Sequence, residues 1–187
     1  MKIIITSTGP RRVGAAVGAW FAAIARERGG LEVEVLDLAE IDLPFMNEPH
    51  HPRLRQYTHQ HTKDWSEAIE SGDAYEFVVP EYNFGINAPM KNALDFLVQE
   101  WSHKPVGFVS YGGVSGGLRA VQMAKQIVTT IKMVPIFEGV AIPFVHANVR
   151  QDGVFEPVEP LIAASAKAML DELTRYAATL APLRDPA

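Results

Sequence analysis

The chain has 187 residues, a formal net charge of −5 and no cysteine. This length is enough for a continuous hydrophobic core, so we expect a single domain over residues 1–187. The acidic balance argues against nucleic acid and against anionic membranes as partners, because both normally require a basic face. The absence of cysteine excludes a disulfide scaffold, a thiol nucleophile and a thiolate metal site.

No segment of the sequence has the properties of a membrane span or a targeting peptide. The apolar run after Lys2 is too short for the core of a signal peptide, and Pro10 interrupts any extension of it. No other stretch approaches the roughly 20 apolar residues that cross a bilayer as a helix. We therefore expect an untargeted cytoplasmic protein, which agrees with the absence of cysteine.

Apolar runs of strand length alternate with segments of helical periodicity along the chain. The β-branched run at 2–7 predicts a buried strand, and the apolar spacing within 13–28 predicts the helix that follows it. By the same signals we expect further strands at 31–38, 74–80, 105–111 and 134–142, the last broken by Gly139. We expect further helices at 58–71, 87–98, 118–131 and 161–180, with Asn87 as the cap of the second of these.

The alternation of strands and helices predicts an α/β fold, a three-layer sandwich whose parallel sheet is covered on both faces. We expect five strands in the order 2-1-3-4-5, in which ligands bind beyond the carboxyl ends of the strands, where the order reverses. The loops after the first, third and fourth strands should therefore converge on one crevice. A further segment, 42–57, is rich in Pro, His and Asn, which is typical of a long surface loop, and loops of that length are commonly functional.

The loop 7–14 has the groups that a phosphate site needs. The hydroxyls of Ser7 and Thr8, the guanidinium groups of Arg11 and Arg12, and backbone N–H groups at a helix start all suit an anion. Taken alone, the loop is equally compatible with a capped turn and solvated arginines. It matches neither the dinucleotide-binding Gly-x-Gly-x-x-Gly motif nor a P-loop.

The loops 80–87 and 110–117 suit a flat ring system. The first has an aromatic side chain and an amide just after a buried strand, where they can stack on a heterocycle and bond its edge. The second is rich in glycine, which lets a planar ring approach the backbone closely. On its own, the first of these loops favours a plain polar turn, and the second is equally compatible with a flexible one.

Three motifs in and around these loops occur together. They are Pro-Glu-Tyr-Asn at 80–83, Lys-Asn-Ala-Leu-Asp at 91–95, and Tyr-Gly-Gly at 111–113 followed by Ser-Gly-Gly-Leu-Arg-Ala at 115–120. With this combination the chain resembles the NADPH-dependent FMN reductase family, which includes chromate, quinone and azo-dye reductases. The resemblance implies a flavodoxin-like fold, bound FMN, and NADPH as the hydride source.

The likeness also assigns roles to individual residues. In the first loop, the FMN phosphate would be held by Ser7, Thr8, Arg12, Val13 and Gly14. The ribityl chain and the isoalloxazine would be bordered by Pro80, Glu81, Tyr82 and Asn83 on one side, with Phe84 altering the pocket over the flavin, and by Tyr111, Gly112 and Gly113 on the other. The family often has Gly-Ser-x-Arg in the first loop, whereas the arginines here are displaced to Arg11 and Arg12. Both are candidate phosphate ligands, and we expect Arg12 to contribute more.

The implied reaction passes hydride or electrons from nicotinamide through FMN to a small acceptor such as a quinone, an azo compound, a metal oxyanion or free flavin. Because the flavin carries the chemistry, we assign no catalytic acid or base and no metal ligand. The resemblance further implies a homodimer or a dimer of dimers, for which the loop 42–57 is a candidate contact.

Two other functions compete with this interpretation. A flavodoxin-type electron carrier would bind FMN without nicotinamide turnover, but carriers normally have a strongly acidic docking face, and this chain is only mildly acidic. A serine hydrolase is suggested by residues 113–117, which match Gly-x-Ser-x-Gly around Ser115. Its partners would be Glu138 and His146, which are too close in sequence to come from separate strand ends. The histidines at 50, 51, 59 and 61 are more typical of solvated or interface residues than of a metal site.

Overall fold

The computed structural model describes residues 1–184 and contains one parallel sheet in the order β2-β1-β3-β4-β5, with β6 also paired to β4. The strands are β1 (Lys2–Ile5), β2 (Glu34–Asp37), β3 (Tyr75–Pro80), β4 (Pro105–Tyr111), β5 (Val134–Pro135) and β6 (Val140–Ile142). The predicted strand order is confirmed. Residues 185–187, which the expected single domain includes, lie outside the described part of the chain.

The last predicted strand, 134–142, forms two short strands instead of one. β5 pairs with the start of β4 and β6 with its end. Pro135 has no amide proton to extend the ladder, and Gly139 has no side chain to pack, so the pairing is interrupted between them. Phe137, in the interruption, is 92% exposed.

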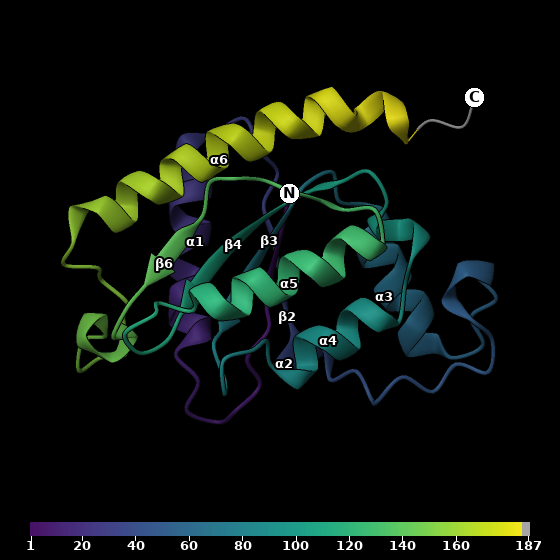
Figure 1. Ribbon diagram of the computed structural model, residues 1–187, viewed down its shortest axis with the longest axis horizontal. Coiled ribbons are helices and arrows are strands. Elements are labelled where there is room, and N and C mark those ends of the chain that lie inside the picture. Colours follow the sequence, from purple (N-terminus) through teal and green to yellow (C-terminus); the bar gives the residue numbers. More distant parts are fainter. Residues whose placement is uncertain (185–187) are drawn as a thin grey trace.

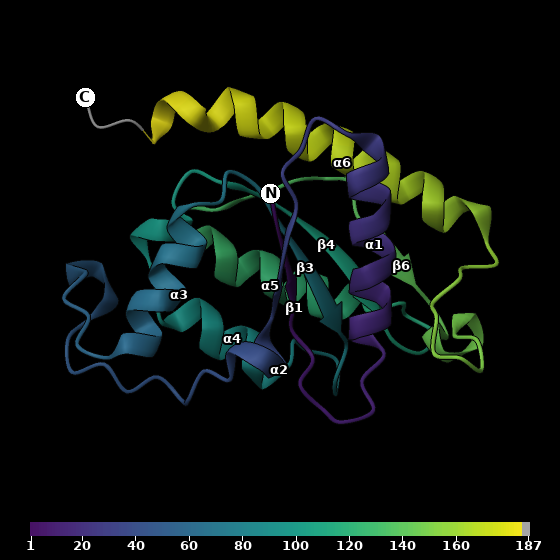
Figure 2. The ribbon, with the colours of Figure 1, turned by 180° about the vertical axis from the view of Figure 1, so that it is seen from behind.

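Helices cover both faces of the sheet (Figures 1 and 2). They are α1 (Gly14–Arg28), α2 (Leu38–Ile41), α3 (Gln60–Glu70), α4 (Ala88–Asp95), α5 (Leu118–Thr130) and α6 (Pro160–Leu180). Short 3-10 helices are η1 (Pro52–Leu54), η2 (Gln99–Trp101), η3 (Val145–Asn148) and η4 (Ala181–Leu183). Among the α-helices of residues 1–184, α2 is the one without a counterpart among the predicted helices. No helix in residues 1–184 has the length and apolarity that crossing a bilayer requires.

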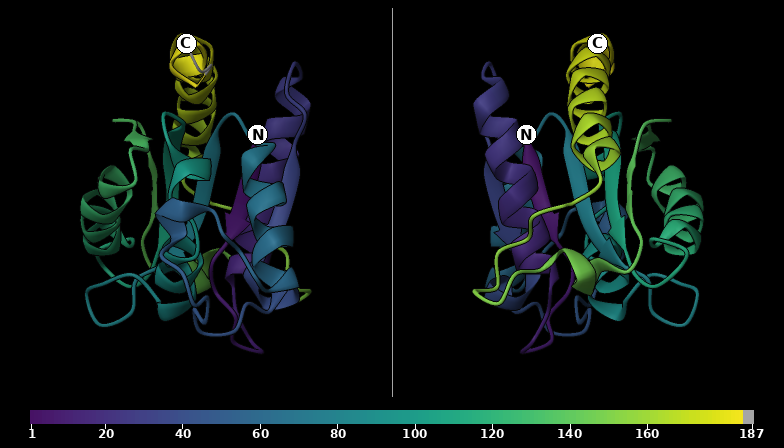
Figure 3. Two further views of the ribbon diagram at one scale, coloured as in Figure 1. Left: turned by 90° about the vertical axis from the view of Figure 1, so that its right-hand side faces the viewer. Right: turned by 90° about the vertical axis from the view of Figure 1, so that its left-hand side faces the viewer.

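The sheet separates two hydrophobic clusters, as expected for parallel strands that are buried on both faces. Ile3 and Ile5 point toward α1 and α6, whereas Ile4 packs in the cluster that includes residues of α3, α4 and α5. Gly107 in β4 lets α6 approach, because a Cβ there would lie 2.8 Å from the Sδ atom of Met169. The result is a three-layer sandwich, which Figure 3 shows from its two ends.

Asn87 occupies the N-cap position of α4, as predicted, but its side chain does not make the capping hydrogen bond that this position usually provides. Asn87 is 3% exposed. The Asn87 Nδ2 atom instead donates to the carbonyl oxygen of Thr6 at 2.6 Å. This bond ties the segment after β3 to the end of β1, so two of the predicted loops are held together by a buried side chain.

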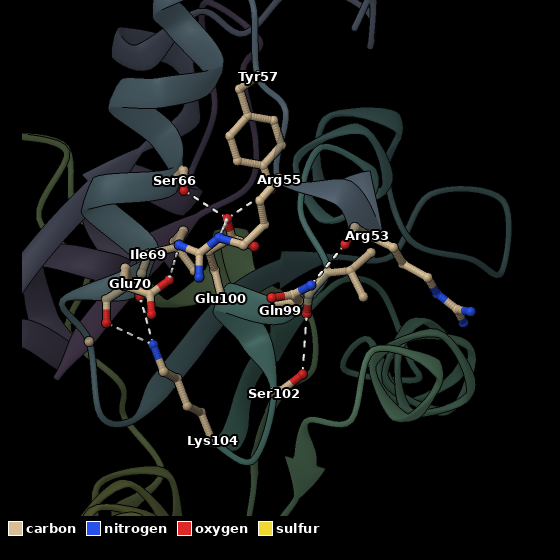
Figure 4. A network of polar contacts seen from close by, with 12 residues as sticks. Arg53, Arg55, Tyr57, Ser66, Ile69, Glu70, Gln99, Glu100, Ser102 and Lys104 are labelled. Carbon is tan, nitrogen blue, oxygen red and sulfur yellow. Dashed lines mark hydrogen bonds and ion pairs between the residues drawn. The ribbon is translucent and has the colours of Figure 1, made fainter. Parts of the chain in front are cut away.

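The long loop between α2 and α3 is anchored to its surroundings at several points (Figure 4). The carboxylate of Glu100, which is fully buried, accepts hydrogen bonds of 2.7 Å from Tyr57 and from Ser66, and Arg55 lies 3.4 Å from it. Gln99 donates to the carbonyl oxygen of Arg53 at 2.8 Å. The loop has almost no regular structure, as predicted, but it is fixed in place by polar contacts.

Candidate functional site

The loops after β1, β3, β4 and β6 line one cavity of about 460 Å³. This volume falls within the range of about 300–1,000 Å³ that is usual for small-molecule sites. The cavity is lined by Arg11, Arg12 and Val13, by Pro80, Glu81 and Tyr82, by Tyr111, Gly112 and Gly113, and by residues 144–147. The structure therefore brings together the three loops that the sequence places at the carboxyl edge of the sheet.

The first loop ends at the N-terminus of α1, directly after Val13. The first N–H groups of an α-helix have no acceptor within the helix. Val13 makes no side-chain capping bond, and the first turn of α1 contains no acidic residue. The positive end of the helix dipole is thus available to an anion.

Two buried hydroxyl groups meet beside Gly14. Ser7 Oγ and Tyr111 Oη are shielded from solvent, and neither has a hydrogen-bond partner within residues 1–184. A Cβ at Gly14 would lie 2.2 Å from Ser7 Oγ and 2.6 Å from Tyr111 Oη, so only glycine fits there. Burial raises the pKa of the Tyr111 phenol to about 12, so the phenol remains a hydrogen-bond donor at neutral pH. Unpartnered hydroxyls next to a helix N-terminus suit a phosphate group.

The two arginines of the first loop have different surroundings. Arg12 Nη1 lies 2.6 and 2.7 Å from the two carboxylate oxygens of Asp37 and donates to the carbonyl oxygen of Ser7 at 3.2 Å. The side chains of Arg12 and Asp37 are only 17% and 10% exposed. Arg11 is exposed and lines the same cavity. Asp37 was not among the predicted site residues, yet it compensates part of the charge of Arg12.

Thr8 lies apart from the other predicted phosphate ligands. It is exposed and lines a second cavity of about 480 Å³, formed by α2, the residues that follow it, and the start of α4. Phe45 and Asn92 belong to the same lining. The structure does not place Thr8 in the wall of the cavity that the three loops share.

Glu81 lines the cavity but directs its carboxylate toward α5. Its Oε2 atom accepts from Ser115 Oγ at 2.9 Å and from the backbone N–H of Arg119 at 3.1 Å, and its Oε1 atom accepts from Arg119 Nε at 2.6 Å. Burial opposes ionisation, but these hydrogen bonds lower the pKa of the Glu81 carboxyl below its ordinary value. Glu81 therefore joins the second loop to the third, and its charge is taken up by Arg119.

The same contacts bear on the hydrolase alternative. Ser115 Oγ donates to a carboxylate and accepts from the N–H of Gly117 at 3.3 Å. Within residues 1–184 the Ser115 hydroxyl has no hydrogen bond to a histidine, although His146 lines the neighbouring cavity. The Ser115 hydroxyl thus bonds Glu81 and the backbone just before α5. The serine–histidine pair that a hydrolase would need is not assembled.

Residues 144–147 were not predicted as part of the site. They follow β6, which is parallel to β4, so they emerge at the same edge of the sheet. Phe144 has a left-handed backbone (φ 47°), its N–H donates to Gly113 at 3.1 Å, and its side chain is 61% exposed. The position of the last predicted strand could have indicated this loop, because every parallel strand ends at the same edge.

The comparison with known sequences identifies the family. Residues 1–147 match the sequence profile of the family described as NADPH-dependent FMN reductase. The chain belongs to this family. Members of the NADPH-dependent FMN reductase family are enzymes that use FMN and a nicotinamide cofactor, so the resemblance stated from the motifs is confirmed.

Individual relatives agree with the family assignment. An NAD(P)H-dependent FMN reductase of Nectria sp is 37% identical over 150 residues, which are 77% of this chain and 75% of that protein. A protein of the same description from Schizosaccharomyces pombe is 36% identical over 133 residues, which are 70% and 66% of the two chains. A solved flavoenzyme NAD(P)H:(acceptor) oxidoreductase from Paracoccus denitrificans has a TM-score of 0.74 at 20% identity, over 95% of this chain and 96% of that one, and shows the shared flavodoxin-like fold.

Proposed function

We propose that this family member oxidises NAD(P)H and passes the electrons through bound FMN to a small acceptor, such as a quinone, an azo compound, a metal oxyanion or free flavin. The observation that carries the proposal is the shared cavity, whose lining residues Val13 and Tyr111 adjoin the phosphate-type site beside Gly14 and whose other walls come from the second and third loops. When bound there, FMN supplies the capacity to accept hydride from nicotinamide and to release electrons to an acceptor.

The residues of the chain bind and orient the cofactor. Arg12, Ser7 and the N-terminus of α1 hold the phosphate, and Arg11 adds positive charge at the rim. Tyr82 and the glycines at 112 and 113 border the ring, where the absence of side chains on the glycines leaves room for close approach. No side chain has to transfer a proton for hydride transfer to occur, so we propose no catalytic acid or base.

An anaerobic titration tests this function. The purified protein is loaded with FMN, and NADPH is added while the visible absorption of the oxidised flavin is followed. We expect bleaching by NADPH and recovery when a quinone or an azo dye is added. Binding of FMN without bleaching would instead support an electron carrier. Esterase activity that Ser115→Ala abolishes would support the hydrolase.

We also propose that the protein is a cytoplasmic homodimer, with the loop 42–57 at the subunit contact. The loop is anchored by Glu100 and Gln99 but exposes Phe45, Met46 and Leu54 at 83%, 43% and 57%. Contiguous exposed apolar side chains commonly mark an interface, and Phe45 and Met46 are adjacent in the chain. The lack of cysteine supports a reducing compartment.

Sedimentation or light scattering measures this association directly. We expect twice the monomer mass for the parent chain and the monomer mass for Phe45→Glu. Phe137→Glu is the matched control, because Phe137 is equally apolar and 92% exposed but lies at the β5 edge of the sheet. A monomeric parent chain, or a Phe45→Glu variant that stays dimeric, would contradict the proposed contact.

A further inference from the structure

The turn after Glu81 has a conformation that other residues must hold in place. Tyr82 and Gly85 exchange two backbone hydrogen bonds of 3.0 Å, and the two residues between them, Asn83 and Phe84, have φ angles of 49° and 68°. Positive φ at both central positions is the geometry of the type I′ two-residue hairpin turn, where glycine and asparagine are favoured. Phenylalanine is unfavourable in this region of backbone conformation, so the Phe84 side chain needs a compensating contact.

Arg119 supplies that contact. Its guanidinium carbon lies 3.8 Å from the centre of the Phe84 ring, while the Nε atom of the same group donates to Glu81 at 2.6 Å. A guanidinium over an aromatic face is attracted by the ring quadrupole. Glu81, which is only 5% exposed at its side chain, thus fixes Arg119, and Arg119 fixes Phe84.

The turn also packs closely against α5. A Cβ at Gly85 would lie 2.9 Å from the Sδ atom of Met123. Two contacts with α5 therefore hold the strained turn. The Phe84 ring stacks on the guanidinium of Arg119, and the backbone at Gly85 packs against Met123. Tyr82, the first residue of the turn, is the one that lines the cavity.

We infer that Glu81, Arg119 and Phe84 form a clamp that positions Tyr82 in the wall of the cavity, and that this clamp sets the affinity for the ring of FMN. Arg119 and Phe84 are absent from the cavity lining, so they act as positioning residues. The inference rests on the proposed FMN site. Pre-organised walls raise affinity because the ligand does not have to order them on binding.

The test measures the dissociation constant of FMN by quenching of flavin fluorescence for the parent chain, Arg119→Ala, Phe84→Ala and the double variant. We expect each single variant to weaken FMN binding roughly tenfold, and the double variant to weaken it no more than Arg119→Ala, because the two side chains form one unit. Arg119→Lys keeps the charge and should bind FMN more tightly than Arg119→Ala. Lys125→Ala, which removes a charge elsewhere on α5, is the control and should match the parent chain.

Thermal unfolding without FMN separates positioning from folding. Phe84 is 69% exposed, so its truncation leaves no core cavity, and we expect Phe84→Ala to unfold at the parent temperature. FMN affinity unchanged in Phe84→Ala and Arg119→Ala, or losses that add in the double variant, would overturn the clamp. A parent chain that fails to bind FMN would refute the proposed function instead, which is a separate outcome of the same titration.

Discussion

Arg12→Ala should weaken FMN binding for two reasons that can be separated. The variant removes a cation from the expected phosphate site, and it uncovers the negative charge of Asp37. Asp37 keeps a bond from the N–H of Ala39 at 3.0 Å but loses both short contacts to Arg12. The uncovered carboxylate then repels the phosphate that the loop has to bind.

The expected size follows from the burial of the pair. Exposed ion pairs contribute about 0–1 kcal/mol, whereas breaking a buried pair costs about 3–5 kcal/mol. With 17% and 10% exposure of the two side chains, we place the loss of folding stability in Arg12→Ala between these limits, at about 2 kcal/mol. Loss of a charge-assisted contact to phosphate, at about 1.5–3 kcal/mol, together with the repulsion, should raise the FMN dissociation constant roughly 100-fold.

The assay is an FMN titration of Arg12→Ala, Asp37→Asn and the double variant, with Arg11→Ala as the matched control. The double variant should bind FMN roughly tenfold more tightly than Arg12→Ala, because no carboxylate is left uncovered. Arg11 is exposed, and its removal should weaken binding less than that of Arg12. The reasoning is refuted if Arg11→Ala is the weaker binder, or if the Asp37→Asn change restores nothing to Arg12→Ala.

Three further predictions concern single residues. Gly14→Ala should abolish FMN binding in the same titration while leaving the circular dichroism spectrum helical, because its Cβ would occupy the space beside Ser7 Oγ; retained affinity would show that the phosphate binds elsewhere. Burial would raise the pKa of the Glu48 carboxyl, but hydrogen bonds from Thr58 and from the N–H of His59 lower it to about 2 from 4.5, so the stability that the ionised carboxylate contributes is present above pH 4.5 and is lost as the pH falls toward 2. Urea unfolding should therefore show Glu48→Gln less stable than the parent chain by about 1 kcal/mol at pH 7, with the difference shrinking in acid; a gap that is constant with pH would contradict this role. Glu76 is fully buried, and burial raises the pKa of its carboxyl well above 4.5, so the folded state holds a proton that the unfolded state releases as the pH rises above 4.5. Glu76→Gln should become more stable relative to the parent chain between pH 5 and pH 8, by up to about 1.4 kcal/mol per pH unit, and equal pH profiles would show that Glu76 is ionised in the fold.

The layout of the fold was predictable because it depends on local patterns. The β-branched run at 2–7 and the apolar run at 105–111 are strands that the structure confirms within a few residues. The parallel order then places the loops at one edge, and the motifs in those loops indicate the family. The last strand was expected with a break at Gly139, but the separation into β5 and β6 was not, because the effect of Pro135 on pairing depends on which strand lies beside it.

The side-chain connections within the site were not predictable in the same way. The bonds from Arg12 to Asp37, from Asn87 to Thr6 and from Arg119 to Glu81 join residues that are 25, 81 and 38 positions apart in the sequence. Asn87 and Glu81 thereby make bonds other than the expected helix cap and the expected ligand-facing contact, whereas Arg12 keeps its place in the cavity lining and gains Asp37 as a partner. A polar residue near a strand end has several possible partners, and packing decides among them.

The most direct measurement of the central claim compares the binding of FMN with that of riboflavin, which has the same ring and no phosphate. If the loops hold a phosphorylated ring in one cavity, with the phosphate at Gly14 and the N-terminus of α1, FMN should bind at least roughly 100-fold more tightly than riboflavin. Equal affinities for the two flavins, or no binding of either, would contradict the account.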